Sequence, residues 1–178
     1  MIQRINRLAS MFLDHVTMSF VLVPLMIAFF VVMQLFAKES YPEFLFQSNR
    51  IGYSVAFLPF LVYFLKDSYR GKSVGKRTIG LQVVNYKTGE PANAFQCFVR
   101  NLFTPIWPLE VLVSIISPSR RLGDIFAYTK VIPSEKEKFK SLIDDVKKTR
   151  FSVYSILILV VGLIYCYGLS FIMIKLQT

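Results

Sequence analysis

Cysteine and histidine are scarce in this chain, which has two cysteines and one histidine among 178 residues. The cysteines form no CxxC pair and the single histidine has no cluster around it, so the spacing of a metal or redox site is missing. The segment GKSVGKR at 71–77 also lacks the GxxxxGKS/T spacing of a phosphate-binding loop. We therefore expect no enzyme, and no bound cofactor or metal.

Charge is scarce in one long stretch of the sequence and missing from another. Between residues 11 and 36 the strongly polar residues are Asp14, His15 and Gln34, and residues 151–174 carry no charge. A helix needs about 20 apolar residues to cross the core of a bilayer. These stretches predict an integral membrane protein and exclude a disordered chain, a disulfide-built secreted domain and a soluble α/β enzyme. We expect one membrane domain over residues 1–178.

Two shorter apolar segments are less clear. Residues 51–65 are uncharged and approach spanning length if the next few residues are added. Residues 94–117 contain Arg100 and Glu110 together with two prolines near their middle. Proline kinks or ends a helix, and a charge at the centre of the bilayer costs about 2.5–3.5 kcal/mol. The second segment is therefore a poor candidate for a complete crossing.

The positive charges favour one topology. Of the 21 lysines and arginines, six fall in residues 66–93 and nine in residues 118–150. Cytoplasmic loops are enriched in such residues, so both loops should lie inside. The loop 37–50, whose two cations are balanced by two glutamates, predicts the outer side and puts the N-terminus in the cytoplasm.

These charges predict an all-α membrane protein with three transmembrane helices. The segment 94–117 becomes a re-entrant or interfacial helical hairpin, broken at Pro105 and Pro108, because crossing would separate the two basic loops. Non-helical backbone at that depth must be buried in protein or line a wet cavity. The alternative is four spans. The first arrangement predicts an external C-terminus and the second an internal one.

Two features of the basic loops predict local structure. Residues 78–85 and 128–132 are β-prone and can pair as a small cytoplasmic β-ribbon if both loops share a side. Further on, Ser134 and Glu137 have the spacing of a capping box. Apolar residues then recur at 3–4 spacing among lysines, which predicts a basic amphipathic helix on the membrane surface before the last span. A solvated charged linker is the alternative.

Three blocks of the sequence carry a recognisable pattern. They are RLASMFLDHV from residue 7, GKSVGKRTIGLQVV from residue 71 and RLGDIFAYTKVI from residue 121. Together they resemble the RDD family of small bacterial membrane proteins. The resemblance covers about residues 4–132, and residues 133–178 add a basic helix and a span that many members lack. It implies a multi-pass protein of the bacterial inner membrane, in a family with suspected transport roles and some links to sodium–proton exchange.

The resemblance also implies which polar residues matter. Arg7, Asp14 and Asp124 match the arginine and two aspartates that name the family, and Arg100 matches an arginine common in the following helix. Gly123 departs from the pattern, because many members carry histidine there.

We expect these residues to form a polar cluster near the cytoplasmic face. Arg7 and Asp14 share a helix face but lie about 10 Å apart along its axis, so each needs another partner. Unpaired buried charges are too costly to persist. We expect Asp14 to pair with Arg100 or Arg77, and Asp124 with Arg7 or Arg121. The expected cluster is Arg7, Asp14, Lys76, Arg77, Arg100 and Asp124, with Asp67 and Glu110 as secondary members.

Two functions from different classes fit these features. In the first, an oligomer transports a small cation or another solute, and Asp14 takes up and releases H⁺ or Na⁺. In the second, a non-transporting scaffold or accessory subunit binds anionic lipid or a partner complex. The net charge of +10 favours a membrane surface over nucleic acid. Lys72, Arg120 and Arg121 are the expected contacts to anionic phospholipid head groups.

Overall fold

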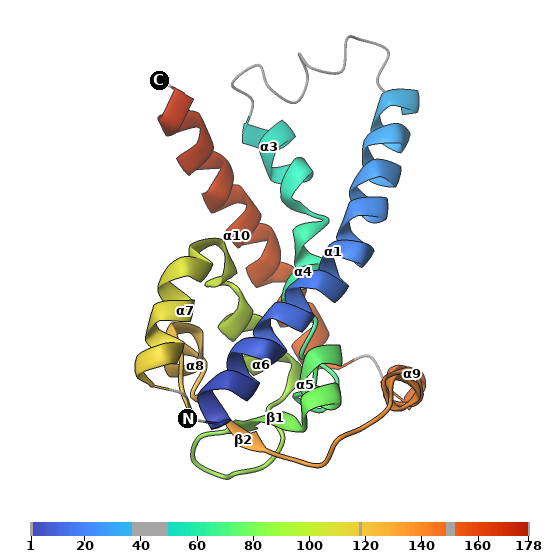
Figure 1. The fold of residues 1–178 in the computed structure, drawn as a ribbon. Helices are drawn as coiled ribbons and strands as arrows, with labels where there is room; N and C mark the ends of the chain where they lie inside the picture. The colour runs from blue at the N-terminus through green and yellow to red at the C-terminus, as the bar shows by residue number, and fades with distance from the viewer. Residues whose placement is uncertain (1, 37–49, 118, 149–151, 178) are drawn as a thin grey trace.

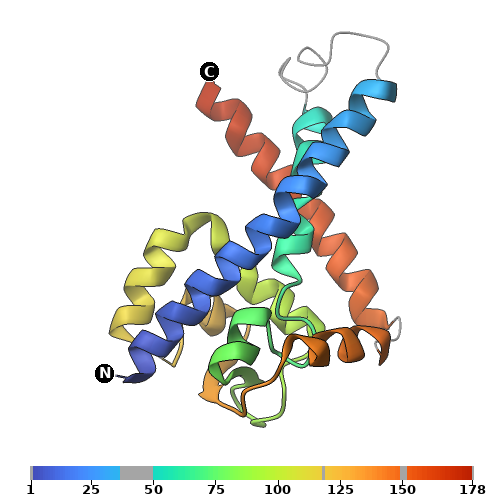
Figure 2. The same ribbon diagram turned by 45° about the vertical axis from the view of Figure 1, so that its right-hand side comes forward.

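Two long helices run through the molecule and cross each other. The computed structural model describes residues 2–36, 50–117, 119–148 and 152–177. Helix α1 (Ile2–Phe36) and helix α10 (Val153–Gln177) cross near their middles, as Figures 1 and 2 show. The start of α1 and the end of α10 lie at opposite ends of the molecule (Figure 1). A chain that crosses a membrane an odd number of times must have its two ends on opposite sides, as they are placed here.

Both long helices can cross a bilayer. Their spanning parts, Arg4–Leu35 and Val153–Leu176, each have a mean hydropathy of 2.5. The expected span at 51–65 appears as two short helices, α3 (Arg50–Phe57) and α4 (Phe60–Phe64), separated next to Pro59. The described part of the chain therefore contains two helices that meet the length of a span, or up to three if a bent helix pair counts as one. That the chain crosses the membrane three times stays a prediction.

The bent pair is the segment that we expected to be re-entrant. Helix α6 (Ala94–Asn101) is followed by a 3₁₀ turn, η1 (Thr104–Ile106), and by α7 (Trp107–Ile116). The two arms of this segment are bent by 111°. The bend coincides with the two prolines, as predicted. Helices α6 and α7 stay in the lower half of the molecule in Figures 1 and 2, short of the end that α1, α3 and α10 reach.

The predicted β-ribbon is confirmed. Strand β1 (Leu81–Asn85) pairs antiparallel with β2 (Thr129–Pro133), and Val83 lies opposite Val131. The first strand is shorter than predicted, because helix α5 (Val74–Ile79) ends at Gly80 in the left-handed conformation. Since paired strands are neighbours, the two basic loops lie on the same side of the structure. The predicted outer loop lies almost wholly outside the described residues.

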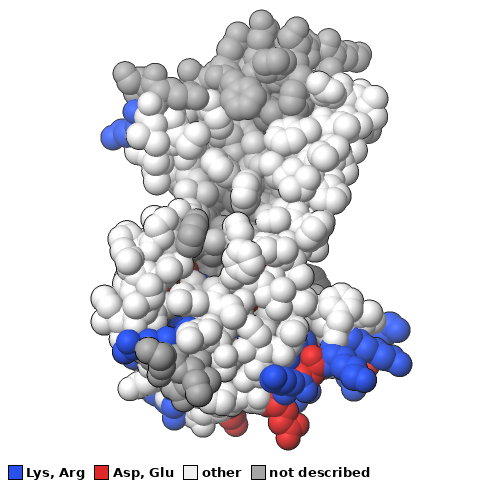
Figure 3. Space-filling model, in the orientation of Figure 1, with Lys and Arg blue, Asp and Glu red and all other residues white. Residues whose placement is uncertain are grey.

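The amphipathic helix is also present, as α9 (Phe139–Lys148). The predicted capping box does not form, because the Glu137 carboxylate pairs with Lys72 and Arg77 instead. The short helix α8 (Leu122–Phe126) precedes β2. Figure 3 shows charged side chains gathered at the lower end of the molecule, around the ribbon and α9, and an almost uncharged surface above them.

Aromatic packing fixes the lower part of α10 against the helices that carry polar residues. Phe64 makes edge-to-face contacts with Phe98 of α6 and Tyr165 of α10, with ring centroids 6.0 and 5.6 Å apart. The Tyr165 hydroxyl donates to the carbonyl oxygen of Leu102 at 2.6 Å. The apolar core therefore lies directly beside the segment that carries Arg100.

Candidate functional site

Eight charged side chains form a connected set inside the lower half of the molecule, and we call this set the charge network. Four are acidic and four are basic, so their formal charges cancel. None is more than 5 % exposed. The members are Arg7, Asp14, Asp67, Lys76, Arg100, Glu110, Arg121 and Asp124.

One end of the network joins α1 to α5. The Lys76 ammonium lies 2.9 Å from the carboxylate of Asp14 and 2.9 Å from that of Asp67. Asp14 also accepts hydrogen bonds from the Ser73 hydroxyl at 2.6 Å and from the Gly75 amide at 2.8 Å. Ser73 is the N-cap of α5, so the start of this helix is built around Asp14.

The close approach of the two helices depends on Gly75. A Cβ atom at this position would lie 2.6 Å from the backbone oxygen of Ser10 and 2.8 Å from the Asp14 carboxylate. Both distances are shorter than real Cβ contacts, so any side chain there would push α5 away from α1. The glycine therefore allows Asp14 to reach its three donors.

Arg100 holds the centre of the network. Its guanidinium lies 2.5 Å from Asp67 and 2.7 Å from Asp124, so one cation bridges two buried aspartates. Asp124 is also paired with Arg7 at 2.6 Å. Burial by itself raises the pKa of Asp124, but the charges of Arg100, Arg121 and Arg7 outweigh it and hold the pKa below its ordinary value. Asp124 is therefore a permanent anion.

A third pair completes the set. Arg121 lies 2.9 Å from Glu110 of α7, and it also donates to the side-chain oxygen of Asn101 at 2.8 Å. Asn101 in turn donates to Asp67 at 3.2 Å, which connects this pair to the centre. A Cβ atom at position 123 would lie 2.0 Å from the Arg100 carbonyl oxygen, so a side chain larger than glycine does not fit here.

A separate polar cluster fastens α9 to α5. Arg77 donates to the carboxylates of Glu137 and Asp145 and to the hydroxyl of Ser141, and it lies 2.7 Å from Asp145. Lys72 lies 2.6 Å from Glu137. Burial raises the pKa of Glu137, but hydrogen bonds from Lys72 and Ser141 and the charges of Lys72 and Arg77 together outweigh it and hold the pKa below its ordinary value.

Most of the predicted cluster comes together, but several details differ. The pairing of Asp124 with Arg7 is as expected. Asp14 pairs with Lys76 rather than with either predicted arginine, because the glycine-rich start of α5 lies directly against α1. Arg77 points away from the network toward α9. Asp67 and Glu110, expected as secondary members, belong to the network fully.

The expected lipid contacts at Lys72 and Arg121 are wrong. Both side chains are about 5 % exposed, and both are engaged in the ion pairs described above. Arg120 lies with its guanidinium 4.3 Å from the centre of the Tyr86 ring. A cation that is already buried and paired has no free charge to offer to a phosphate group.

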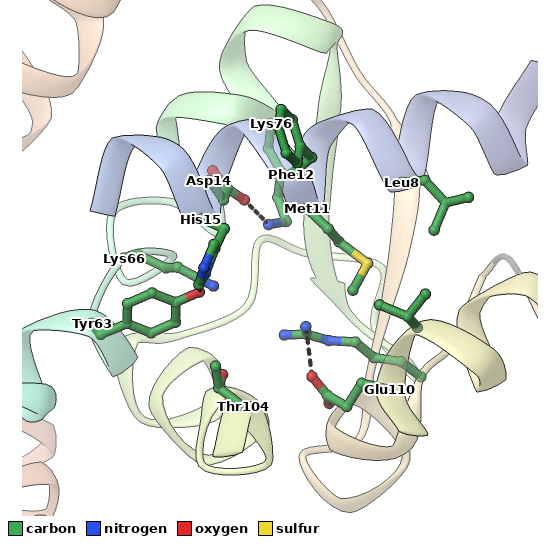
Figure 4. A pocket seen from close by; sticks show the side chains of 12 residues that line it. Leu8, Met11, Phe12, Asp14, His15, Tyr63, Lys66, Lys76, Thr104 and Glu110 are labelled. Carbon is green, nitrogen blue, oxygen red and sulfur yellow. Dashed lines mark hydrogen bonds and ion pairs between the residues drawn. The ribbon is translucent and has the colours of Figure 1, made fainter. Parts of the chain in front are cut away.

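A cavity of about 210 Å³ lies beside the network. Figure 4 shows the Asp14–Lys76 pair on one side of it and Glu110, paired with Arg121, on the other. Lys66 also lines it, with its ammonium 4.1 Å from the centre of the Tyr63 ring. The remaining lining residues are Leu8, Met11, Phe12, His15, Thr104 and Val111.

The cavity contains polar groups that the sequence alone did not single out. The Tyr63 hydroxyl lies 3.2 Å from Nδ1 of His15. Among the described residues, Oγ1 of Thr104 and Nε of Arg121 are buried without a hydrogen-bond partner. His15 and Arg121 lie inside the blocks that resemble the RDD family, whereas no spacing in the sequence connects Thr104 or Tyr63 to those blocks. In the part of the chain that is described, no group of three His, Cys, Asp or Glu is placed to hold a metal ion.

Comparisons with known proteins give one match. No curated protein and no solved structure matches the chain. The sequence model of the RDD family matches residues 3–177, so the match includes α9 and α10, which lie beyond the three recognised blocks. The chain is therefore a member of the RDD family.

Proposed function

We propose that this protein exchanges a small monovalent cation for a proton, and that Asp14 is the residue that binds the cation. The observation that carries the proposal is the position of the Asp14–Lys76 pair on the wall of the cavity. A carboxylate oxygen is a suitable ligand for a hard cation. The cavity would give such a cation access to that oxygen.

The type of cation in each pair decides where exchange takes place. Three of the four positive residues in the network are arginines, which keep their proton under all ordinary conditions. Lys76 is the exception, because the lysine side chain, unlike that of arginine, can take part in proton transfer. Binding of one monovalent cation to Asp14 with loss of one proton from Lys76 leaves the network neutral. The reaction therefore exchanges one cation for one proton.

Lys66 strengthens this coupling. Its ammonium lies in the same cavity, and its described contact is with the face of the Tyr63 ring. Its positive charge repels an incoming cation. A fall in the positive charge of the cavity therefore favours cation entry. We further propose that a homo-oligomer completes the pathway across the membrane, because so few spanning helices enclose little space.

A second candidate function is a non-transporting membrane scaffold. The complete pairing of the network favours it, since four anions and four cations satisfy one another inside the fold. In that case the network holds the loops and helices together, and Asp14 serves only to fasten α5 to α1.

Exchange measured in proteoliposomes distinguishes the two functions. A Na⁺ or Li⁺ gradient is imposed, and a trapped pH-sensitive dye reports proton movement. We expect exchange by the wild type and none by Asp14→Asn or by Lys76→Arg. The arginine variant retains the positive charge but not the ability to lose a proton. Lys87→Arg, at an exposed turn, is the matched control and should exchange normally.

Unfolding temperatures in detergent show whether each variant is folded. A folded Asp14→Asn or Lys76→Arg protein that exchanges as well as the wild type would refute the proposed mechanism. A wild-type protein that is folded and inactive with Na⁺, Li⁺ and K⁺ would favour the scaffold.

A further inference from the structure

We propose that the exposed face of helix α9 binds the anionic lipids of the membrane that α1 and α10 cross. The sequence predicts a helix at the membrane surface here, and the structure adds which face of it binds lipid. This site differs from the head-group contacts expected at Lys72, Arg120 and Arg121, and it does not depend on the exchange function. The observations that support it are the apolar residues of α9, the attachment of its opposite face, its lysines and its position.

The apolar residues of α9 form one stripe. Phe139, Ile143 and Val146 follow the 3–4 spacing that places side chains on one side of a helix. They are 60 %, 44 % and 44 % exposed. These side chains therefore face outward in the structure and present apolar area to whatever surrounds the protein.

The opposite side of the helix is tied to the protein. Ser141 and Asp145 both accept hydrogen bonds from Arg77, and Glu137 just before the helix accepts from Lys72. These bonds fix the rotation of α9 about its own axis. The apolar stripe consequently cannot turn inward to complete the core, and its exposure is a feature of the docked helix.

The charge around the stripe suits an anionic surface. Residues 135–148 contain five lysines and four acidic residues. Two of the acidic residues, Glu137 and Asp145, form ion pairs with Arg77, and Glu137 also pairs with Lys72. The segment therefore has five lysines against two remaining acidic residues, an excess of three positive charges. Each cation near an anionic leaflet contributes about 1 kcal/mol of attraction. The lysines are Lys136, Lys138, Lys140, Lys147 and Lys148.

The position of α9 selects the membrane rather than a partner protein. Figure 2 shows α9 lying crosswise at the foot of α10. The helix ends at Lys148, and the spanning part of α10 begins at Val153, so α9 is held close to the point where the chain enters the bilayer. A helix with an apolar stripe and a basic border in this position is suited to the membrane–water boundary.

Tryptophan fluorescence of the full-length protein tests this proposal. The chain has a single tryptophan, so Trp107→Phe gives a silent background into which Phe139→Trp is placed. Asp144→Trp in the same background reports the exposed side that does not carry the stripe, and serves as the control. Each protein is reconstituted into phosphatidylcholine vesicles with or without phosphatidylglycerol, using acyl chains with or without bromine.

We expect the tryptophan at 139 to shift to shorter wavelength and to be quenched by brominated chains, more strongly when phosphatidylglycerol is present. The control at 144 should stay accessible to aqueous iodide. Lys140→Gln combined with Lys147→Gln should remove the dependence on phosphatidylglycerol. Equal exposure to water at 139 and 144 in both kinds of vesicle would refute the proposal. Shielding at 139 that disappears when the protein is diluted in lipid would assign the stripe to a second copy of the chain instead.

Discussion

The ammonium of Lys76 lies 2.9 Å from the carboxylate of Asp14, although 62 residues separate them in the sequence. This pair joins the first membrane helix to a short helix in the first basic loop. Lys76 also differs from the other three cations of the charge network, which are all arginines. The predictions below test how the network and its neighbours support the fold.

Removing the central cation should destabilise the protein strongly. Arg100→Leu leaves the buried carboxylates of Asp67 and Asp124 without the cation that bridges them. Loss of one partner of a buried pair typically costs about 3–5 kcal/mol. We expect a comparable fall in the free energy of unfolding, measured by denaturant titration in detergent micelles. Arg120→Leu, which loses a contact with the Tyr86 ring, should cost about 1 kcal/mol or less.

A single methyl group should separate α5 from α1. Gly75→Ala places a Cβ atom against the backbone of Ser10, which cannot move aside as a flexible side chain could. Overpacking of this kind costs about 1–3 kcal/mol. Gly168→Ala in α10 is the matched control, because nothing lies within 4 Å of its Cβ position. An equal unfolding temperature for the two variants would show that the contact with Ser10 is looser than described.

The Glu110–Arg121 pair should be energetically coupled. Glu110→Gln and Arg121→Gln each leave the other residue charged and buried, whereas the double variant leaves neither. The cost of the double variant should therefore be smaller than the sum of the single costs, by about 0.5–3 kcal/mol as found for contacting residues. Strict additivity would mean that the two side chains act independently.

The attachment of α9 should weaken in acid. The pKa of Glu137 is lowered in the folded protein, so its contribution to docking is complete above its ordinary pKa of about 4.3. The contribution is lost as the pH falls through the lowered value, because protonation removes the charge that Lys72 and Arg77 contact. Amide hydrogen exchange in α9, corrected for the intrinsic pH effect, should rise over this interval. In Glu137→Gln, amide hydrogen exchange in α9 should already be fast at neutral pH, and it should change less as the pH falls.

The sequence predicted the elements of this fold better than their contacts. The ribbon was predictable because both strands are β-prone, and α9 because its apolar residues keep helical spacing. The capping box at Ser134 failed because its glutamate pairs with two cations that lie 60 and 65 residues earlier in the chain. No local pattern contains that information.

The same limit applies to the site. Charge and burial indicated that Asp14 needs a cation, but the choice of Lys76 depends on the close packing at Gly75, which only the folded chain reveals. Asn101 illustrates this further: its amide joins Asp67 to Arg121, and no spacing in the sequence connects it to either residue.

The order of the network along the chain has a consequence for biosynthesis. All eight members lie between residues 7 and 124, and β2 ends at Pro133, so the whole neutral set has been translated before α10. Domains commonly fold from the N-terminal side during synthesis. The charge network can therefore assemble on the nascent chain. Insertion of α10 then covers the side of the fold that carries Phe64 and Phe98.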